Sequence, residues 1–347
     1  MKIICGTDFS EHAVQASRAA AFVSLRLGDE VVLAHIWDEA LSEGLWNDSH
    51  DRITAAVRNR LYDHAIRLRE TTGARVAEET FSGIPDVELV RMASRSEVRL
   101  LVVGPLGRRP GEWLFGSVAE RAPMRAPVST LVVRSAAPFE AWARGKAPLK
   151  IFVAFDFSGT AESELRWVKD LTAAGPCEIV VSYVDWPMGE AARLGVSGEF
   201  LKGQNPPQVQ RILERELSER VGALWGETVA RIRVEPSIGR ADVRLVEMAR
   251  EEQADLVVTG THQRHGLDAR GSQQTQPRAE SRRRVAVIEE SDIAKAIRQE
   301  AERFGAHLVC IGSHGRSGLA KAVLGSVAQS LMAQSPRPVL VIRKPLS

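Results

Sequence analysis

The sequence predicts an α/β protein with two five-stranded-type parallel sheets flanked by helices. Two observations carry this prediction. Short, almost wholly apolar runs alternate along the chain with longer segments in which apolar residues recur every three or four positions, so strands alternate with helices. Blocks of sequence also recur, which indicates two copies of one unit within the 347 residues. Strands that are apolar at nearly every position are typical of parallel sheets covered on both faces.

The first copy is expected to span residues 1–136. Its strands are expected at residues 2–5, 30–34, 75–78, 100–103 and 128–133. The first two helices are marked by apolar residues three and four apart over residues 13–27 and 53–68. Asp86 is expected to cap the third helix, and Ser117 to begin the fourth.

The second copy begins in the same way. Lys2-Ile3 and Asp8-Phe9-Ser10 recur, at one constant offset, as Lys150-Ile151 and Asp156-Phe157-Ser158. Further strands and the longest helix are expected at residues 151–154, 178–183, 231–235 and 256–259 and at residues 209–224. We therefore expect a second domain over residues 148–267, but one that lacks the last helix and strand of the first.

The remaining residues indicate a linker followed by half a unit. Residues 268–284 are polar and aperiodic, which is typical of a flexible linker. Residues 285–347 then indicate strand, helix, strand, helix and strand. The expected bounds of these elements are 285–288, 292–304, 308–311, 319–333 and 338–342. Because an exposed strand edge invites unwanted pairing, we expect this half-unit to dock on the second domain and supply its missing edge.

Composition argues against several classes of protein. The 46 basic and 44 acidic residues leave a formal net charge of +2, whereas a nucleic-acid-binding domain usually concentrates a basic excess on one face. No uncharged apolar run approaches the ~20 residues that span a bilayer, and no apolar signal follows Met1, so we expect a cytoplasmic protein. Three cysteines without regular spacing, Cys5, Cys177 and Cys310, argue against a disulfide framework or a zinc site.

The strongest chemical motif lies in the half-unit. Gly312 and Gly315 follow an expected strand, and after nine further residues Gly325 and Ser326 begin an expected helical turn. Glycines let a backbone approach a phosphate closely, and the amides at a helix N-terminus favour anions. In parallel sheets, ligands bind at the carboxyl ends of strands. The spacing therefore predicts a site for a polyphosphate.

This Gly-x2-Gly-x9-Gly-Ser spacing resembles the nucleotide-binding signature of the universal stress proteins. The resemblance extends over both copies and the half-unit, and includes the Asp-x-Ser after each first strand. It implies the adenine nucleotide α-hydrolase-like fold, with ATP as the ligand, with or without Mg²⁺. It also implies pairing of two such units, within one chain or in a homodimer, and an unidentified protein partner. The residues that it assigns to the nucleotide are Asp8, Asp156, Gly312, Gly315, Arg316, Gly325 and Ser326.

The other two copies of the loop depart from this spacing. Gly104 and Gly107 are followed after only eight residues by Gly116 and Ser117, so the first loop is one residue short but keeps its glycines. We expect these four residues to form a second candidate site. In the second copy Gln263 replaces the second glycine and no Gly-Ser follows, so this copy is not expected to bind phosphate by itself.

The expected function is that of an ATP-binding regulatory or stress-response protein with little or no catalysis, since no general base is evident. Two alternatives stay open: a scaffold of the same family that binds no nucleotide, and an adenylyl-transferring enzyme of the same fold. Asp8 and Asp156 could instead only cap the helices that follow them. If the half-unit completes the second copy, Asp156 would meet Gly312 and Gly325 in one composite pocket.

Overall fold

The computed structural model describes most of the chain. The described residues are 1–37, 47–105, 117–157, 161–196, 204–226, 230–237, 241–260, 331–332, 335 and 337–342, without the side chains of residues 47–51, 53 and 117. The chain divides into one unit of residues 1–267 and 322–347 and another of residues 268–321. The second unit lies wholly outside the described residues, and so does most of the expected half-unit.

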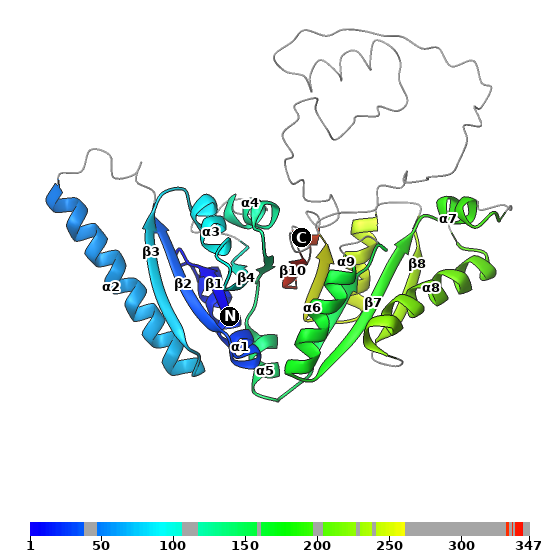
Figure 1. Cartoon of the computed structure of the whole chain (residues 1–347), viewed down its shortest axis with the longest axis horizontal. Helices are drawn as coiled ribbons and strands as arrows, with labels where there is room; N and C mark the ends of the chain where they lie inside the picture. The colour runs from blue at the N-terminus through cyan, green and yellow to red at the C-terminus, as the bar shows by residue number, and fades with distance from the viewer. Residues whose placement is uncertain are drawn as a thin grey trace, which may run out of the picture. The chain divides into compact units, whose positions relative to one another are not determined.

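The first copy forms a parallel half-sheet, which confirms the predicted fold class. Its strand order is β3-β2-β1-β4-β5 (Figure 1). The strands are β1 (Lys2–Gly6), β2 (Glu30–Trp37), β3 (Val76–Ser82), β4 (Val98–Val103) and β5 (Ser129–Val132). The helices between them are α1 (Glu11–Leu27), α2 (Asn47–Thr72), α3 (Pro85–Ala93) and α4 (Ser117–Arg125). Every strand and helix expected in this copy is present, with shifted ends.

The second copy repeats this order as a continuation of the same sheet. Its strands run β10-β9-β6-β7-β8, so β6 takes the central place that β1 has in the first copy. These strands are β6 (Leu149–Ala154), β7 (Cys177–Asp185), β8 (Arg231–Pro236), β9 (Leu256–Gly260) and β10 (Val339–Ile342). The helices are α6 (Ala161–Ala174), α7 (Pro187–Arg193), α8 (Pro207–Trp225) and α9 (Ala241–Glu251).

The strand β10 joins the two halves of the sheet. It pairs parallel with β9, in the register Leu340 with Val258, and antiparallel with β5, in the register Leu340 with Leu131. The two predicted sheets therefore form one continuous ten-stranded sheet. β10 holds the place in the second copy that β5 holds in the first. Docking of the rest of the half-unit, like the domain boundaries, stays a prediction, because residues 261–330 lie outside the described part of the chain.

Different helices cover the two faces of the sheet. Alternate residues of a strand point to opposite faces, so Ile3 packs in one core cluster and Ile4 in the other. The helices α1, α2, α6 and α8 contribute to the first cluster, and α3, α4 and α9 to the second. Among the described helices, none has the length and apolar character to cross a membrane.

The predicted N-cap of α3 is wrong. The helix begins at Pro85, its N-cap residue is Ile84, and no side chain caps it. Proline fits the first helical position because its fixed φ is helical and it has no N–H to satisfy. Asp86 instead lies buried in the first turn, where Arg125 Nη1 of α4 donates to its Oδ2 over 3.0 Å. This carboxylate ties α3 to α4.

A short helix that the sequence did not predict, α5 (Ala137–Ala143), fills the connection between the copies. Its Trp142 is fully buried. Arg26 Nη2 of α1 donates to the Trp142 carbonyl oxygen over 2.8 Å, and Arg18 Nη2 donates to Glu140 Oε2 over 2.6 Å. The connection is therefore part of the core rather than a free linker.

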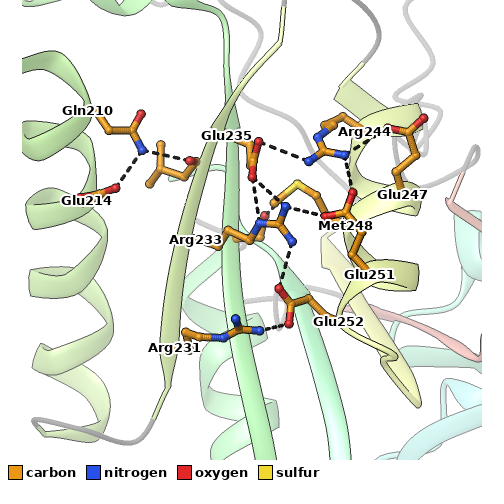
Figure 2. A network of polar contacts seen from close by, with 12 residues as sticks. Gln210, Glu214, Arg231, Arg233, Glu235, Arg244, Glu247, Met248, Glu251 and Glu252 are labelled. Atoms are coloured by element: carbon orange, nitrogen blue, oxygen red, sulfur yellow. Dashed lines mark hydrogen bonds and ion pairs between the residues drawn. The ribbon is translucent and has the colours of Figure 1, made fainter. Parts of the chain in front are cut away.

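Charged residues protect the edge strand β8. Figure 2 shows Arg233 between Glu235 of its own strand and Glu251 and Glu252 of the segment that ends α9, at N–O distances of 2.6 to 2.9 Å. Arg244 extends the network to Glu235 and Glu251. Charged side chains on an edge strand oppose pairing with another chain, so this network disfavours the addition of a further strand next to β8.

Candidate functional site

Two places in the sheet meet the geometric requirement for a ligand site. The strand order reverses between β1 and β4, and again between β6 and β9. Helices that follow on either side of such a point pack on opposite faces, and ligands of parallel sheets bind at the carboxyl ends of the two strands there. Asp8 and Gly104 follow β1 and β4 at the first point. Asp156 and Gly260 lie at the matching ends of β6 and β9 at the second.

A tight turn after β1 orients Asp8. The Ser10 amide donates to Asp8 Oδ1 over 3.0 Å, and the Phe9 amide donates to Thr7 Oγ1 over 3.1 Å. Ser10, and not Asp8, is the N-cap residue of α1, because its Oγ accepts a hydrogen bond from the Ala13 amide over 3.2 Å. The Asp8 carboxylate therefore shapes the turn ahead of the helix and does not cap the helix itself.

Phe9 holds this turn in a left-handed conformation, with φ of 63°. A bulky residue at such a φ costs roughly 1–2 kcal/mol, so surrounding contacts must stabilise it. The Phe9 ring packs on His35, with centroids 4.6 Å apart, and the Arg60 guanidinium lies 4.5 Å from the ring centroid. His35 Nδ1 lies 2.7 Å from the Thr7 carbonyl oxygen, so we assign the proton to Nδ1.

A second imidazole, His64 of α2, lies 6.3 Å from Phe9 between ring centroids. Burial lowers the pKa of His64, and the charges of Arg67 and Arg60 lower it further. Ser17 Oγ donates to the Val14 carbonyl, so it accepts from His64 Nε2 across 3.1 Å. Two imidazoles and an arginine therefore lie around the Phe9 ring in the first turn.

Gly104 has a packing role that the sequence did not predict. A Cβ at this position would lie 3.1 Å from the carbonyl carbon and oxygen of His12, in the first turn of α1. The missing side chain therefore lets the end of β4 approach α1 closely. Gly107 and Gly116 lie outside the described residues, and Ser117 begins α4 without a described side chain. Their expected contact with phosphate stays a prediction.

The turn after β6 shares the left-handed phenylalanine of the first turn but has different neighbours. Phe157 also has a left-handed φ, of 59°. Its ring meets Phe155 and Tyr183 edge to face, at centroid distances of 5.1 and 4.9 Å. By strand register Tyr183 takes the place of His35, and its hydroxyl donates to Glu190 Oε1 over 2.8 Å.

A buried carboxyl group that sequence reasoning missed lies beside the second turn. Glu164, in the first turn of α6, is 1% exposed. Burial raises the pKa of Glu164 well above its usual value, the nearby charge of Asp156 raises it further, and a hydrogen bond from the Gly260 amide partly offsets both. Its Oε2 atom has no hydrogen-bond partner among the described residues. Burial therefore favours the neutral form of this carboxyl group in the folded chain.

A second buried carboxyl lies at the end of β7. Burial, with the charges of Glu190 and Glu235, raises the pKa of Asp185 to about 6, although a hydrogen bond from Asn205 Nδ2 to its Oδ1 opposes the shift. Its Oδ2 has no partner in the described part of the chain. Within the same residues, no group of three or more His, Cys, Asp or Glu could hold a metal ion.

The described residues thus include only part of the predicted site. It places Asp8 with Gly104 at one strand-order reversal and Asp156 at the other. The loop residues of the half-unit lie outside the described residues, namely Gly312, Gly315, Arg316, Gly325 and Ser326. Glu164 was missed although the signal was present: it falls on the buried stripe formed by the apolar residues Ala161, Leu165 and Val168 of α6.

Comparison with known proteins identifies a family that the sequence matches. The sequence profile of the universal stress protein family matches residues 1–134, 149–276 and 268–343. Universal stress protein MJ0577 of Methanocaldococcus jannaschii is 28% identical over 154 residues, which are 38% of this chain and 94% of that protein.

A solved structure of low sequence identity shares the fold. A universal stress protein of Archaeoglobus fulgidus DSM 4304 superposes with a TM-score of 0.60 at 16% identity, covering 99% of this chain and 98% of its own. Another universal stress protein from Archaeoglobus fulgidus was solved in complex with dAMP; it is 12% identical, covers 57% of this chain and 98% of its own, and has a TM-score of 0.29.

Proposed function

The chain belongs to the universal stress protein family, and we propose that it is a regulatory protein that binds ATP, with little or no catalysis of its own. The observation that carries this proposal is the spacing of Gly312, Gly315, Gly325 and Ser326 in a region that the family profile matches. Three glycines and a serine at this spacing suit a polyphosphate.

The described part of the sheet supports the proposal. Both Asp-Phe-Ser turns lie at strand-order reversals, where a parallel sheet offers a crevice to a ligand. Two phenylalanines at positive φ, Phe9 and Phe157, shape the turns alike in both copies. Strained residues persist only where their surroundings over-determine them, and they gather at ligand sites. The adenosine end of the nucleotide would lie near Asp8 or Asp156.

The proposed absence of strong catalysis rests on the groups around the first turn. His35 already donates from Nδ1 to the Thr7 carbonyl, and His64 Nε2 is bonded to Ser17. His35 Nδ1 and His64 Nε2 thus serve structural contacts, whereas a general base must reach the proton that it removes. Binding of ATP would instead order the glycine loop and change a surface that a partner protein contacts.

The test compares ATP binding to the full chain and to Gly315→Val by isothermal titration calorimetry and thermal unfolding. We expect ATP at 100 times its Kd to stabilise the wild-type chain by about 2.7 kcal/mol, and Gly315→Val to lose this effect at the C-terminal loop. Gly271→Val, the same change in the expected linker, is the matched control and should bind ATP normally.

The alternatives predict other results. A scaffold that binds no nucleotide would show no ATP-dependent rise in melting temperature in any of the three proteins. An adenylyl-transferring enzyme would release pyrophosphate from ATP in the presence of an acceptor at a rate well above background. Unchanged affinity in Gly315→Val would remove the glycine loop from the site.

A further inference from the structure

Two buried oxygen atoms without a donor lie at the end of β7. Asp185, the last residue of this strand, is 2% exposed, and its Oδ2 has no hydrogen-bond partner among the described residues. Asn205, two residues before α8 begins, carries the other: its Oδ1 is buried and also lacks a partner in the described part of the chain. Buried polar atoms are almost always hydrogen-bonded, so two such atoms in neighbouring side chains require a physical explanation.

The hydrogen bonds around these atoms use every amide donor of the two side-chain amides. Gln210 Nε2 donates to Glu214 Oε1 and to the Val234 carbonyl oxygen, over 2.8 and 3.0 Å (Figure 2). Gln210 Oε1 therefore accepts, and it does so from Asn205 Nδ2 over 3.0 Å. The second N–H of Asn205 Nδ2 donates to Asp185 Oδ1, also over 3.0 Å. Because acceptors at both ends fix the orientation of each amide, neither amide has an N–H left for Asp185 Oδ2.

We propose that Asp185 is a neutral acid whose Oδ2–H donates to Asn205 Oδ1, and that this proton makes the contact between the end of β7 and the start of α8 sensitive to pH. One proton satisfies both oxygen atoms, because a neutral carboxyl group is a donor as well as an acceptor. The acid and the amide then exchange two hydrogen bonds. When Asp185 releases the proton to solvent, one bond remains and both oxygen atoms are again without a donor. This inference is independent of nucleotide binding.

The surrounding charges favour the neutral acid. Burial raises the pKa of Asp185 to about 6; the hydrogen bond from Asn205 opposes this shift, and the charges of Glu190 of α7 and Glu235 of β8 add to it. Both of these carboxylates are paired with an arginine of their own element. On α8, the carboxylate of Glu214 accepts an amide N–H. The contact should therefore change between pH 5 and pH 8.

The first copy has no counterpart of this contact. By strand register, Trp37 at the end of β2 takes the place of Asp185. The backbone has the same role in both copies: the Trp37 carbonyl oxygen accepts from the Gly83 amide over 3.0 Å, and that of Asp185 accepts from the Ser237 amide over 2.8 Å. An indole ring cannot ionise near neutral pH, so the proposed pH sensitivity belongs to the second copy alone.

The experiment follows the side-chain carbonyl carbon of Asn205 by NMR in the full chain. The chain has three asparagines, Asn47, Asn59 and Asn205, so asparagine labelled with ¹³C gives three side-chain carbonyl signals, and Asn205→Ser identifies the third. Each protein is titrated from pH 5 to pH 8. Asp185→Asn keeps the shape and supplies a permanent N–H in place of the O–H. Glu178→Gln removes an exposed carboxylate from the same strand and is the matched control.

In the wild type and in Glu178→Gln, we expect the Asn205 signal to move downfield as pH falls through about 6. The physical reason is that a carbonyl group is deshielded when its oxygen accepts a hydrogen bond. In Asp185→Asn the signal should stay at one position over the whole range. An Asn205 signal that does not titrate in the wild type, or that titrates equally in Asp185→Asn, would overturn the proposal.

Hydrogen exchange of residues 210–217 tests the effect on α8. If opening of this contact restores the ordinary pKa of 3.8 to Asp185, exchange in the wild type, corrected for its intrinsic pH dependence, should accelerate by up to about tenfold between pH 5 and pH 8. Glu178→Gln should show the same acceleration and Asp185→Asn none. Equal acceleration in the wild type and Asp185→Asn, or none in either, would contradict control of this contact by the proton.

Discussion

Phe9 and Phe157 have the same left-handed φ in the two turns but different neighbours. Phe9 packs on imidazoles and an arginine, from His35, His64 and Arg60. Phe157 packs on Phe155 and Tyr183, with the carboxyl group of Glu164 buried nearby. The two copies therefore share the left-handed phenylalanine of the turn, whereas the ionisable side chains around it differ. Lowering the pH should therefore destabilise the fold around the first turn, where the pKa of His64 is lowered, and stabilise it around the second, where the pKa of Glu164 is raised.

The largest expected effect is a loss of stability in Gly104→Val, which tests the close approach of β4 to α1 beside the first turn. Gly104→Val would push a side chain into the His12 backbone, which lies 3.1 Å from an added Cβ. We expect a loss of about 2–3 kcal/mol in the free energy of unfolding, measured by chemical denaturation. Gly222→Ala in α8, where nothing lies within 4 Å of an added Cβ, is the control. It should be neutral or stabilise by up to about 1 kcal/mol. Similar stability of both variants would contradict the close approach of β4 to α1.

A smaller effect is expected from the carboxyl group at the end of β7. The pKa of Asp185 is raised to about 6 from an ordinary value of 3.8, so the unfolded chain binds fewer protons between these values and stability falls as pH rises through them. Asp185→Asn should stabilise the chain by about 1–2 kcal/mol at pH 8 and leave it unchanged near pH 3.5. Equal gains at both pH values would assign the effect to packing instead of charge.

The smallest effect is expected from His64, and it has the opposite sign. Because the pKa of His64 is lowered in the folded chain, the unfolded chain binds more protons below pH 6.5, and stability falls as pH drops through that range. His64→Asn should reduce the fall in the free energy of unfolding between pH 7.5 and pH 5.5 by less than about 1 kcal/mol, as measured by chemical denaturation at the two pH values. A steeper acid loss in the variant would mean that the folded chain prefers the charged imidazole.

The contrast between the two turns also marks what the sequence could predict. Apolar runs and helical spacing located the strands and long helices of both copies, because both faces of this sheet are buried and each period is visible. The Asp-Phe-Ser repeat identified the two turns that the structure places at the strand-order reversals. The short helix α5 was missed, since seven residues offer too little periodicity.

The surroundings of the turns could not be predicted in the same way. His35 and His64 come together with Phe9 only because α2 folds back over β2, and no local pattern joins residues so far apart. Glu164 was within reach, because a charged residue on the buried stripe of a helix is itself a signal. The placement of β10 between β5 and β9 depended on tertiary pairing, which composition and spacing do not specify.

The central claim is that this chain holds a nucleotide. Native mass spectrometry of the full-length protein, purified without added nucleotide and then equilibrated with ATP and Mg²⁺, tests it most directly. The account predicts a species heavier than the bare chain by the mass of ATP, and loss of that species in Gly315→Val. A spectrum that shows only the bare chain at ATP concentrations far above a micromolar Kd would contradict it.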